Sequence, residues 1–185
     1  MPVNTIEYIT IASAGDASDF GDLTDARSYL GGGIMSSTRG VWIGGLDPSV
    51  SDIMDYVTTA STGNATDFGD LSAGRQQLNG LSSSTRGVSL GGQSPSNVDI
   101  CEYITIASTG NMTDFGNLTA ARSANAAVSD RTRGVTGGGG APGVVNIIEY
   151  ITIASTGNSA DFGDISSRAI KDMVCCSDAH GGLQT

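Results

Sequence analysis

The chain has 185 residues, of which 38% are hydrophobic and 27 are glycine, and its formal net charge at pH 7 is −10. A chain this acidic repels nucleic acid and anionic lipid, so we expect neither as a partner. The sequence has no apolar run near the roughly 18 residues of a membrane span, and its N-terminus shows no signal peptide.

The chain begins on a predicted strand, TIEYITI from Thr5 to Ile11. Runs of β-branched residues between Gly-rich turns favour strands, and no sustained 3.6-residue apolar period predicts a helix. The first complete unit has four predicted strands, at residues 27–33, 40–45, 53–60 and 66–72. STGN joins the last two strands, and its Gly63-Asn64 pair predicts a tight hairpin turn with positive φ.

The same unit recurs along the whole chain, at steps of 48, 47 and 47 residues. Three kinds of residue mark its structural positions: Tyr8, Tyr56, Tyr103 and Tyr150; Phe20, Phe68, Phe115 and Phe162; and Arg27, Arg75, Arg122 and Arg168. A second set of arginines in STRGV or RTRGV contains Arg39, Arg86 and Arg133.

Four short strands in a period of about 47 residues are typical of a propeller blade. We therefore predict an all-β fold, a small β-propeller of four four-stranded blades in a single domain, 1–185. The repeats are about 27–74, 75–121 and 122–167, with a last repeat of 168–185 completed by 1–26, so that the N-terminal strands close the ring. Two alternatives stay open: two chains share an eight-bladed ring, or the chain is a fragment.

The order of features within each unit resembles the kelch repeat: arginine, apolar strand, strand ending in a Gly-Gly doublet, tyrosine strand, aromatic residue. The doublets are Gly44-Gly45, Gly91-Gly92 and Gly139-Gly140. Phenylalanine stands where the family usually has tryptophan, and the last repeat lacks its doublet. The resemblance covers nearly the whole chain and implies kelch-like blades that act as a binding scaffold. Enzymes of the family carry additional metal ligands, which this sequence does not show.

The wording of the repeat, with YITIASTGN, DFGDL, AR and STRGV, resembles kelch-like proteins of tailed phages, especially marine ones. The resemblance implies a virion protein assembled in the host cytoplasm, such as a tail, fibre or head-surface component. Its partners would be other virion proteins or further copies of itself.

Polar residues three apart flank each Asp-Phe pair, beginning with Asp16, Asp19 and Asp22. Such oxygens are calcium ligands, but their spacing is not that of an EF-hand loop, and Asn and Asp also cap turns through backbone bonds. We favour capping. The arginines after the fourth strand are expected to pair with carboxylates such as Asp19 or Asp67, and a ring of arginines recognising an anion is the alternative.

No catalytic residue, metal site or cofactor is predicted. Cys101 occupies a packing position, and Cys175 and Cys176 are read as free thiols of a reducing compartment. His180 is the only histidine, and no nucleophile motif accompanies it. Trp42 and Tyr29 are aromatic where the other repeats are not, so they are candidates for binding a partner or glycan, or for filling a gap in the first blade.

The leading hypothesis is a non-enzymatic structural and interaction module of a phage virion, a rigid propeller on which other proteins dock. The alternative is a soluble lectin-like or receptor-binding propeller that recognises a host surface glycan through loops that differ between repeats. An enzyme with copper or another metal is disfavoured by the lone histidine.

Overall fold

The computed structural model describes residues 1–141, 143–165 and 168–175, and within these ranges the chain forms strands and no helix. The predicted all-β class is confirmed. Within the same ranges there is accordingly no helix long and apolar enough to cross a membrane.

Three four-stranded antiparallel sheets follow one another along the chain, each with its strands in sequence order. The first sheet contains β3 (Gly31–Met35), β4 (Arg39–Ile43), β5 (Ile53–Thr58) and β6 (Thr66–Asp70). The second contains β7 (Asn79–Ser82), β8 (Arg86–Leu90), β11 (Ile100–Thr105) and β12 (Thr113–Asn117). The third contains β13 (Ala126–Ser129), β14 (Arg133–Gly137), β15 (Ile147–Thr152) and β16 (Ala160–Asp164).

Two smaller pairs of strands complete the fold. At the N-terminus β1 (Val3–Tyr8) pairs with β2 (Ser18–Arg27), and these two correspond to the third and fourth strands of a unit. A short ribbon of β9 (Gln93–Ser94) and β10 (Ser96–Asn97) lies between β8 and β11.

The first strand of each unit begins later than predicted. In the first unit it was expected at residues 27–33, but β3 starts at Gly31, and Arg27 belongs to the end of β2. The chain changes direction at Tyr29, whose φ is 53°. That backbone conformation interrupts a strand, so the residues between Arg27 and Gly31 form the connection between units.

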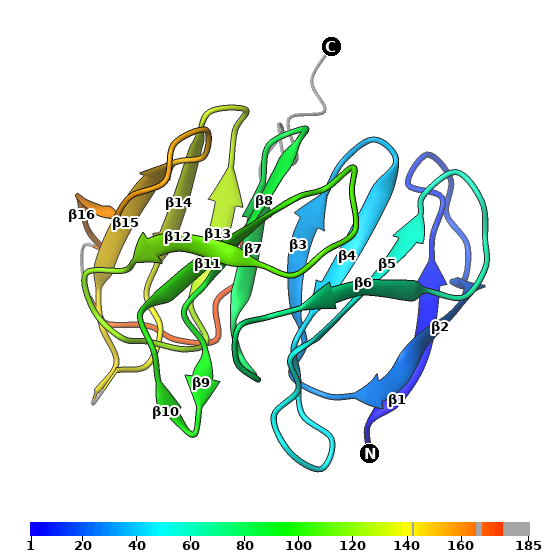
Figure 1. Ribbon diagram of the computed structural model, residues 1–185, viewed down its shortest axis with the longest axis horizontal. Helices are drawn as coiled ribbons and strands as arrows, with labels where there is room; N and C mark the ends of the chain where they lie inside the picture. The colour runs from blue at the N-terminus through cyan, green and yellow to red at the C-terminus, as the bar shows by residue number, and fades with distance from the viewer. Residues whose placement is uncertain (142, 166–167, 176–185) are drawn as a thin grey trace.

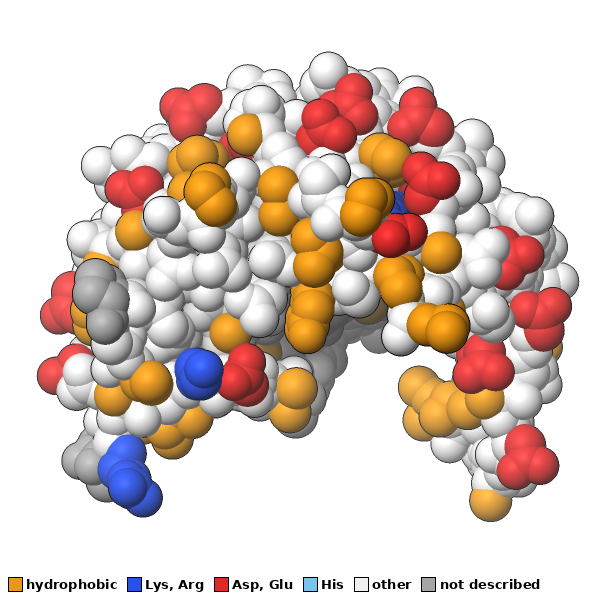
Figure 2. Space-filling model, turned by 90° about the horizontal axis from the view of Figure 1, so that it is seen from below, with side chains coloured by type: hydrophobic (Ala, Val, Ile, Leu, Met, Phe, Trp, Pro, Cys, Tyr) orange, Lys and Arg blue, Asp and Glu red, His pale blue; other side chains and the backbone are white. Residues whose placement is uncertain are grey.

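The innermost strands of the three sheets, β3, β7 and β13, are neighbours. Ser82 Oγ donates to the carbonyl of Met35 over 2.9 Å, and Ser129 Oγ donates to the carbonyl of Ser82 over 2.8 Å. The innermost strands therefore lie near a common axis, with the sheets side by side in Figure 1 and arranged as an arc in Figure 2.

The apolar core lies between successive sheets. Phe68 on β6 is 2% exposed and packs with Ile104 and Ile106, which come from the end of β11 and the residue beyond it. The next core repeats this arrangement with Phe115, Ile151 and Ile153. The first and second sheets are thus each covered by two isoleucines of the unit that follows.

The arc is open. Ribbon β1–β2 lies at one end and β15–β16 at the other, and the space-filling view shows a hollow between the two ends (Figure 2). The expected closure by the chain's own N-terminal strands is not made among the described residues, where β1 pairs with β2 alone. Most of the strands expected from residues 168–185 lie outside the described ranges, and 168–175 form no strand.

Candidate functional site

Three buried arginines each form an ion pair with a carboxylate on the third strand of the sheet that follows the arginine in the chain. The pairs are Arg27–Asp55, Arg75–Glu102 and Arg122–Glu149, and all six side chains are at most 3% exposed. This burial supports the structural interpretation, since an anion from solvent cannot reach the guanidinium groups.

The sequence predicted carboxylates such as Asp19 and Asp67 as the partners of these arginines, and this prediction is wrong. A β-bulge shifts the pairing of β5 with β6 between Met54 and Asp55, and the same shift occurs in the second and third sheets. A bulge re-aims a side chain, which accounts for the acidic residue that follows it facing the interior.

Arg168, the fourth arginine of the series, does not join this pattern. Its side chain is exposed, and Ile170 occupies the equivalent backbone position. Gly139 donates its amide to the Ile170 carbonyl over 2.7 Å, as Gly92 does to Arg122 over 2.9 Å. The glycines that correspond to Gly44-Gly45 by their positive φ are accordingly Gly138-Gly139, one residue earlier than the predicted doublet.

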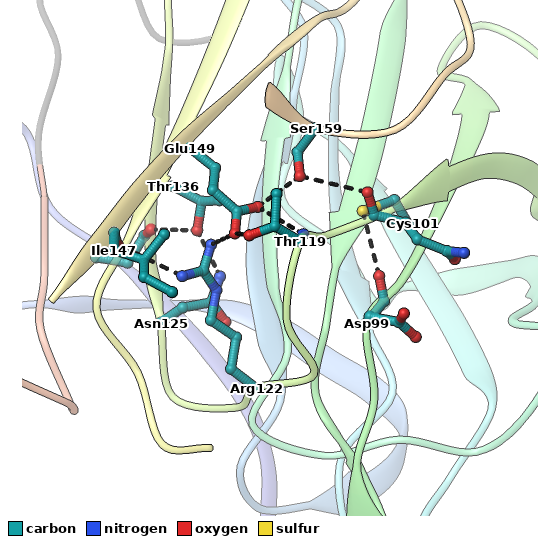
Figure 3. A network of polar contacts seen from close by, with 11 residues as sticks. Asp99, Cys101, Thr119, Arg122, Asn125, Thr136, Ile147, Glu149 and Ser159 are labelled. Atoms are coloured by element: carbon teal, nitrogen blue, oxygen red, sulfur yellow. Dashed lines mark hydrogen bonds and ion pairs between the residues drawn. The ribbon is translucent and has the colours of Figure 1, made fainter. Parts of the chain in front are cut away.

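The pair formed by Arg122 and Glu149 is the centre of a polar network (Figure 3). Arg122 Nη2 lies 3.1 Å from Glu149 Oε1. Glu149 also accepts from the Thr119 amide over 3.2 Å, from the Thr119 hydroxyl, and from Ser159 Oγ over 2.5 Å. Thr119 follows β12 of the second sheet, so this carboxylate joins two sheets, and Glu102 accepts from Ser72 in the same way.

Burial also changes the proton affinities of the groups around this network. It lowers the pKa of the Arg122 guanidinium, and the charge of Glu149 opposes that shift. Burial raises the pKa of the Cys101 thiol to about 12, helped by the negative charge of Glu149. Cys101 is fully buried and its Sγ lies 3.7 Å from the Asp99 carbonyl oxygen, so its predicted packing role agrees with its position.

The repeated tyrosines and phenylalanines form four edge-to-face pairs with ring centroids 5.7 to 6.1 Å apart. In the three complete sheets an arginine of the STRGV or RTRGV motif lies over the tyrosine: Arg39, Arg86 and Arg133, at 4.4, 4.4 and 4.5 Å from the ring centroids. Arg86 Nη1 also donates to the carbonyls of Ile153 and Ala154, over 3.0 and 2.9 Å, which links the second sheet to the third unit.

The loop between the third and fourth strands is not the tight turn that the sequence suggested. Residues 59–65 reach across to the preceding unit, where the Gly63 amide donates to the Phe20 carbonyl over 2.7 Å. Asn64 Oδ1 accepts from the Asp22 amide over 3.1 Å. The equivalent loops of the next two units make the same contacts, with Asn111 and Asn158 as acceptors. The side-chain-to-backbone role expected of these residues is present, but it joins neighbouring units rather than capping one turn.

The apolar residues that join the units are exposed at both ends of the arc. Ile9 and Ile11 are 62% and 94% exposed, whereas their counterparts in the second and third sheets and just beyond them, Ile104, Ile106, Ile151 and Ile153, are at most 4% exposed. At the opposite end Phe162 is 55% exposed, whereas Phe68 and Phe115 are each 2% exposed. We call residues 9–17 the N-terminal loop face, and Arg133, Tyr150 and residues 161–164 the β16 face. Sequence reasoning did not single out Ile9 and Ile11, although both belong to a copy of the repeated YITI segment.

The two aromatic candidates, Tyr29 and Trp42, do not form one site. Trp42 is partly buried in the core between the β1–β2 ribbon and the first sheet, where it packs beside Ile6 and Leu23 and fills space. Tyr29 is 59% exposed and lines a cavity of about 230 Å³ close to the common axis, together with Gln77, Asn79, Asn125 and Asp172. Tyr29, Gln77 and Asp172 belong to a backbone ladder around the axis, in which Gln77 donates to Tyr29 over 3.1 Å and Asp172 to Ala124 over 3.0 Å.

Within the described ranges, three or more His, Cys, Asp or Glu side chains do not come together as a metal-binding cluster. Cys175 is exposed. His180 and Cys176 lie outside the described residues, as does the strand expected from Ala179. No family model matches the chain, and no curated protein matches it in sequence.

Proposed function

We propose that the chain is a non-enzymatic interaction module, a rigid scaffold whose two ends dock on protein. One observation carries this proposal: residues that pack one unit on the next inside the molecule are exposed at both ends of the arc. Exposed apolar residues gathered on one face mark interaction sites. The buried ion pairs and backbone bonds between units support its rigidity.

The architecture proposed with this function is a propeller of kelch-like blades. Its support is the common axis, the sequential order of strands in each sheet and the position of β1–β2 as the second half of a blade. The ring is completed where the β16 face receives an N-terminal loop face. That contact is made either within one chain, giving four blades, or between two chains.

We propose a tailed-phage particle as the assembly in which this module works, as a tail, fibre or head-surface component. The support for this placement is the resemblance of the repeat wording alone. The test is quantitative mass spectrometry of purified particles of the phage that encodes the chain. Peptides of this chain in a fixed ratio to the major structural proteins support the placement, and their absence from intact particles contradicts it.

Glycan binding is the second candidate function, and the cavity beside Tyr29 favours it. An exposed aromatic ring among amide side chains and a carboxylate offers an apolar face together with hydrogen-bond donors and acceptors, the chemistry that binds a sugar. A glycan array tests this function directly. Binding that is lost in Tyr29→Ala and kept in Val144→Ala supports it, and an array without signal contradicts it.

A further inference from the structure

We propose that the β16 face binds the N-terminal loop face of a second copy of this chain, so that copies join head to tail. This inference rests on the proposed function, because it names the partner of the same two docking faces. Its basis is a comparison of the two faces with the three contacts between units that already exist inside the molecule.

Each existing contact between units uses the same backbone bonds. The glycine of the loop donates to the phenylalanine carbonyl of the preceding unit over 2.7 Å at all three contacts: Gly63 to Phe20, Gly110 to Phe68, and Gly157 to Phe115. Two residues later the loop donates again, to Asp22, Asp70 or Asn117, over 2.7 to 2.9 Å. A fourth contact would use the amides of Gly15 and Ala17 and the carbonyls of Phe162 and Asp164.

The side chains at the two ends complete the same pattern. Ile9 and Ile11 occupy the positions of Ile104 and Ile106, which cover Phe68. Arg133 already lies over Tyr150, but among the described residues its guanidinium has no carbonyl partner, whereas Arg39 Nη1 donates to the Ile106 carbonyl over 2.9 Å. By position, Ile11 would supply the carbonyl for Arg133.

The N-terminal loop already forms the first turn of the docked loops. The Ser13 amide donates to the Thr10 carbonyl over 3.1 Å, and the equivalent bonds from Ser61, Ser108 and Ser155 measure 3.2 to 3.3 Å. A loop that is ordered before it binds loses less conformational entropy on binding, which favours association.

Backbone contacts at glycines argue for a second copy over the chain's own loop. A Cβ atom on Gly69 would lie 2.5 Å from the Gly110 carbonyl oxygen, and Gly21 and Gly116 are equally close to Gly63 and Gly157. Direct contacts between backbone atoms therefore set the spacing between units at these three junctions. Because such close-packed contacts have low compressibility, the units cannot move closer together. Because the arc cannot tighten, its two ends stay apart, as Figure 2 shows, and a second copy satisfies both.

The charges on the two faces predict how the contact is tuned. The existing loops present Asn64, Asn111 and Asn158, whereas the N-terminal loop presents Asp16 at this position. In the proposed contact Asp16 would lie beside Asp164, and two neighbouring carboxylates repel each other. Added salt therefore strengthens the association, and Asp16→Asn strengthens it several-fold at low salt.

The experiment measures the molar mass in solution of the full chain over a range of protein concentrations. The wild type, Ile11→Glu and Phe162→Glu are measured separately. The wild type associates, and each variant alone is monomeric, because each head-to-tail contact needs one intact face of each kind. The dissociation constant rises about a hundred-fold or more, since a charge replaces a buried apolar side chain. Val144→Glu, on an exposed residue outside both faces, leaves the association unchanged.

Mixing the two variants is the decisive step. Each supplies the intact face that the other lacks, so the mixture forms a one-to-one dimer that cannot extend further. A wild type that is monomeric throughout, with Ile11→Glu lowering its thermal stability, would show closure within one chain and overturn the inference. A mixture that stays monomeric although the wild type associates would also overturn it. Neither result bears on the particle test of the proposed function, which can fail or succeed independently.

Discussion

The amide nitrogen of Gly110 lies 2.7 Å from the carbonyl oxygen of Phe68, one unit earlier in the chain. This bond is possible because Gly69 brings no side chain to the contact, and it recurs at each junction between units. The junctions explain why the chain repeats one segment: each copy of the loop holds the unit before it. They also explain why the first copy of the loop and the last copy of the strand are exposed.

Replacing a glycine at a filled junction is expected to cost more than replacing its counterpart at the open end. Gly116 and Gly163 have φ of 142° and 139°, but a Cβ on Gly116 would lie 2.4 Å from the Gly157 oxygen, whereas a Cβ on Gly163 meets nothing within 4 Å. Backbone strain of about 1–3 kcal/mol is common to Gly116→Ala and Gly163→Ala, and the clash adds to the first alone. Denaturant unfolding at low protein concentration checks this, and equal losses would contradict it.

The buried ion pair of Arg122 predicts that replacing this arginine destabilises the protein far more than replacing Arg168, its counterpart in the sequence repeat. Arg122→Met leaves Glu149 charged and buried, which lowers the free energy of unfolding by about 3–5 kcal/mol. Arg168→Met changes an exposed residue, so its effect stays within about 0.5 kcal/mol. Urea titrations of both variants decide the matter, and comparable losses would mean that Arg168 occupies a buried site.

Comparing Arg86 with Arg133 measures what the hydrogen bonds between units contribute to stability. Both lie over a tyrosine, at 4.4 and 4.5 Å from the ring centroids, but in the part of the chain that the structure describes only Arg86 donates to carbonyls of the next unit. We expect Arg86→Met to lower the free energy of unfolding by about 1–3 kcal/mol more than Arg133→Met, because hydrogen bonds from charged groups contribute that much. Thermal unfolding of the monomer measures the difference. An effect of Arg133→Met as large as that of Arg86→Met would contradict the assignment.

Cys101 predicts a loss of stability at alkaline pH. Its pKa is raised from 9.0 to about 12 in the folded chain, so between these values the folded state holds a proton that the unfolded state has released. Its contribution to stability is therefore complete below pH 9 and falls as the pH rises toward 12. The difference in stability between wild type and Cys101→Ala, followed from pH 8 to 11, should shrink as the pH rises. A difference independent of pH would show that the thiol ionises equally in both states.

The strands could be predicted from the sequence because their pattern is local. Alternating β-branched residues and the spacing of Tyr56 and Phe68 placed β5 and β6 nearly at their observed bounds. The fourth arginine could not be placed by residue type alone. Arg122 lies eight residues after Asp114, whereas Ile170, which has the equivalent backbone position, lies nine residues after Asp161 and Arg168 only seven.

The contacts between units could not be predicted from the sequence. STGN has the composition of a tight turn, and only tertiary packing makes it a longer loop that bonds to the preceding sheet. The partner of Arg27 depended on a bulge before Asp55, which has no local signature. In the sequence Ile9 and Ile11 look like ordinary strand residues. Their importance follows only from the burial of their counterparts at the junctions between units.

Amide hydrogen exchange at Gly15 and Ala17 shows whether the N-terminal loop docks as the internal loops do. Their counterparts Gly63 and Ala65 donate to carbonyls of the preceding unit over 2.7 Å, so they should exchange slowly in every sample. Head-to-tail docking predicts that Gly15 and Ala17 exchange slowly in concentrated wild-type protein and rapidly in Phe162→Glu. Rapid exchange of both amides in the concentrated wild type, as fast as in the variant, would contradict it.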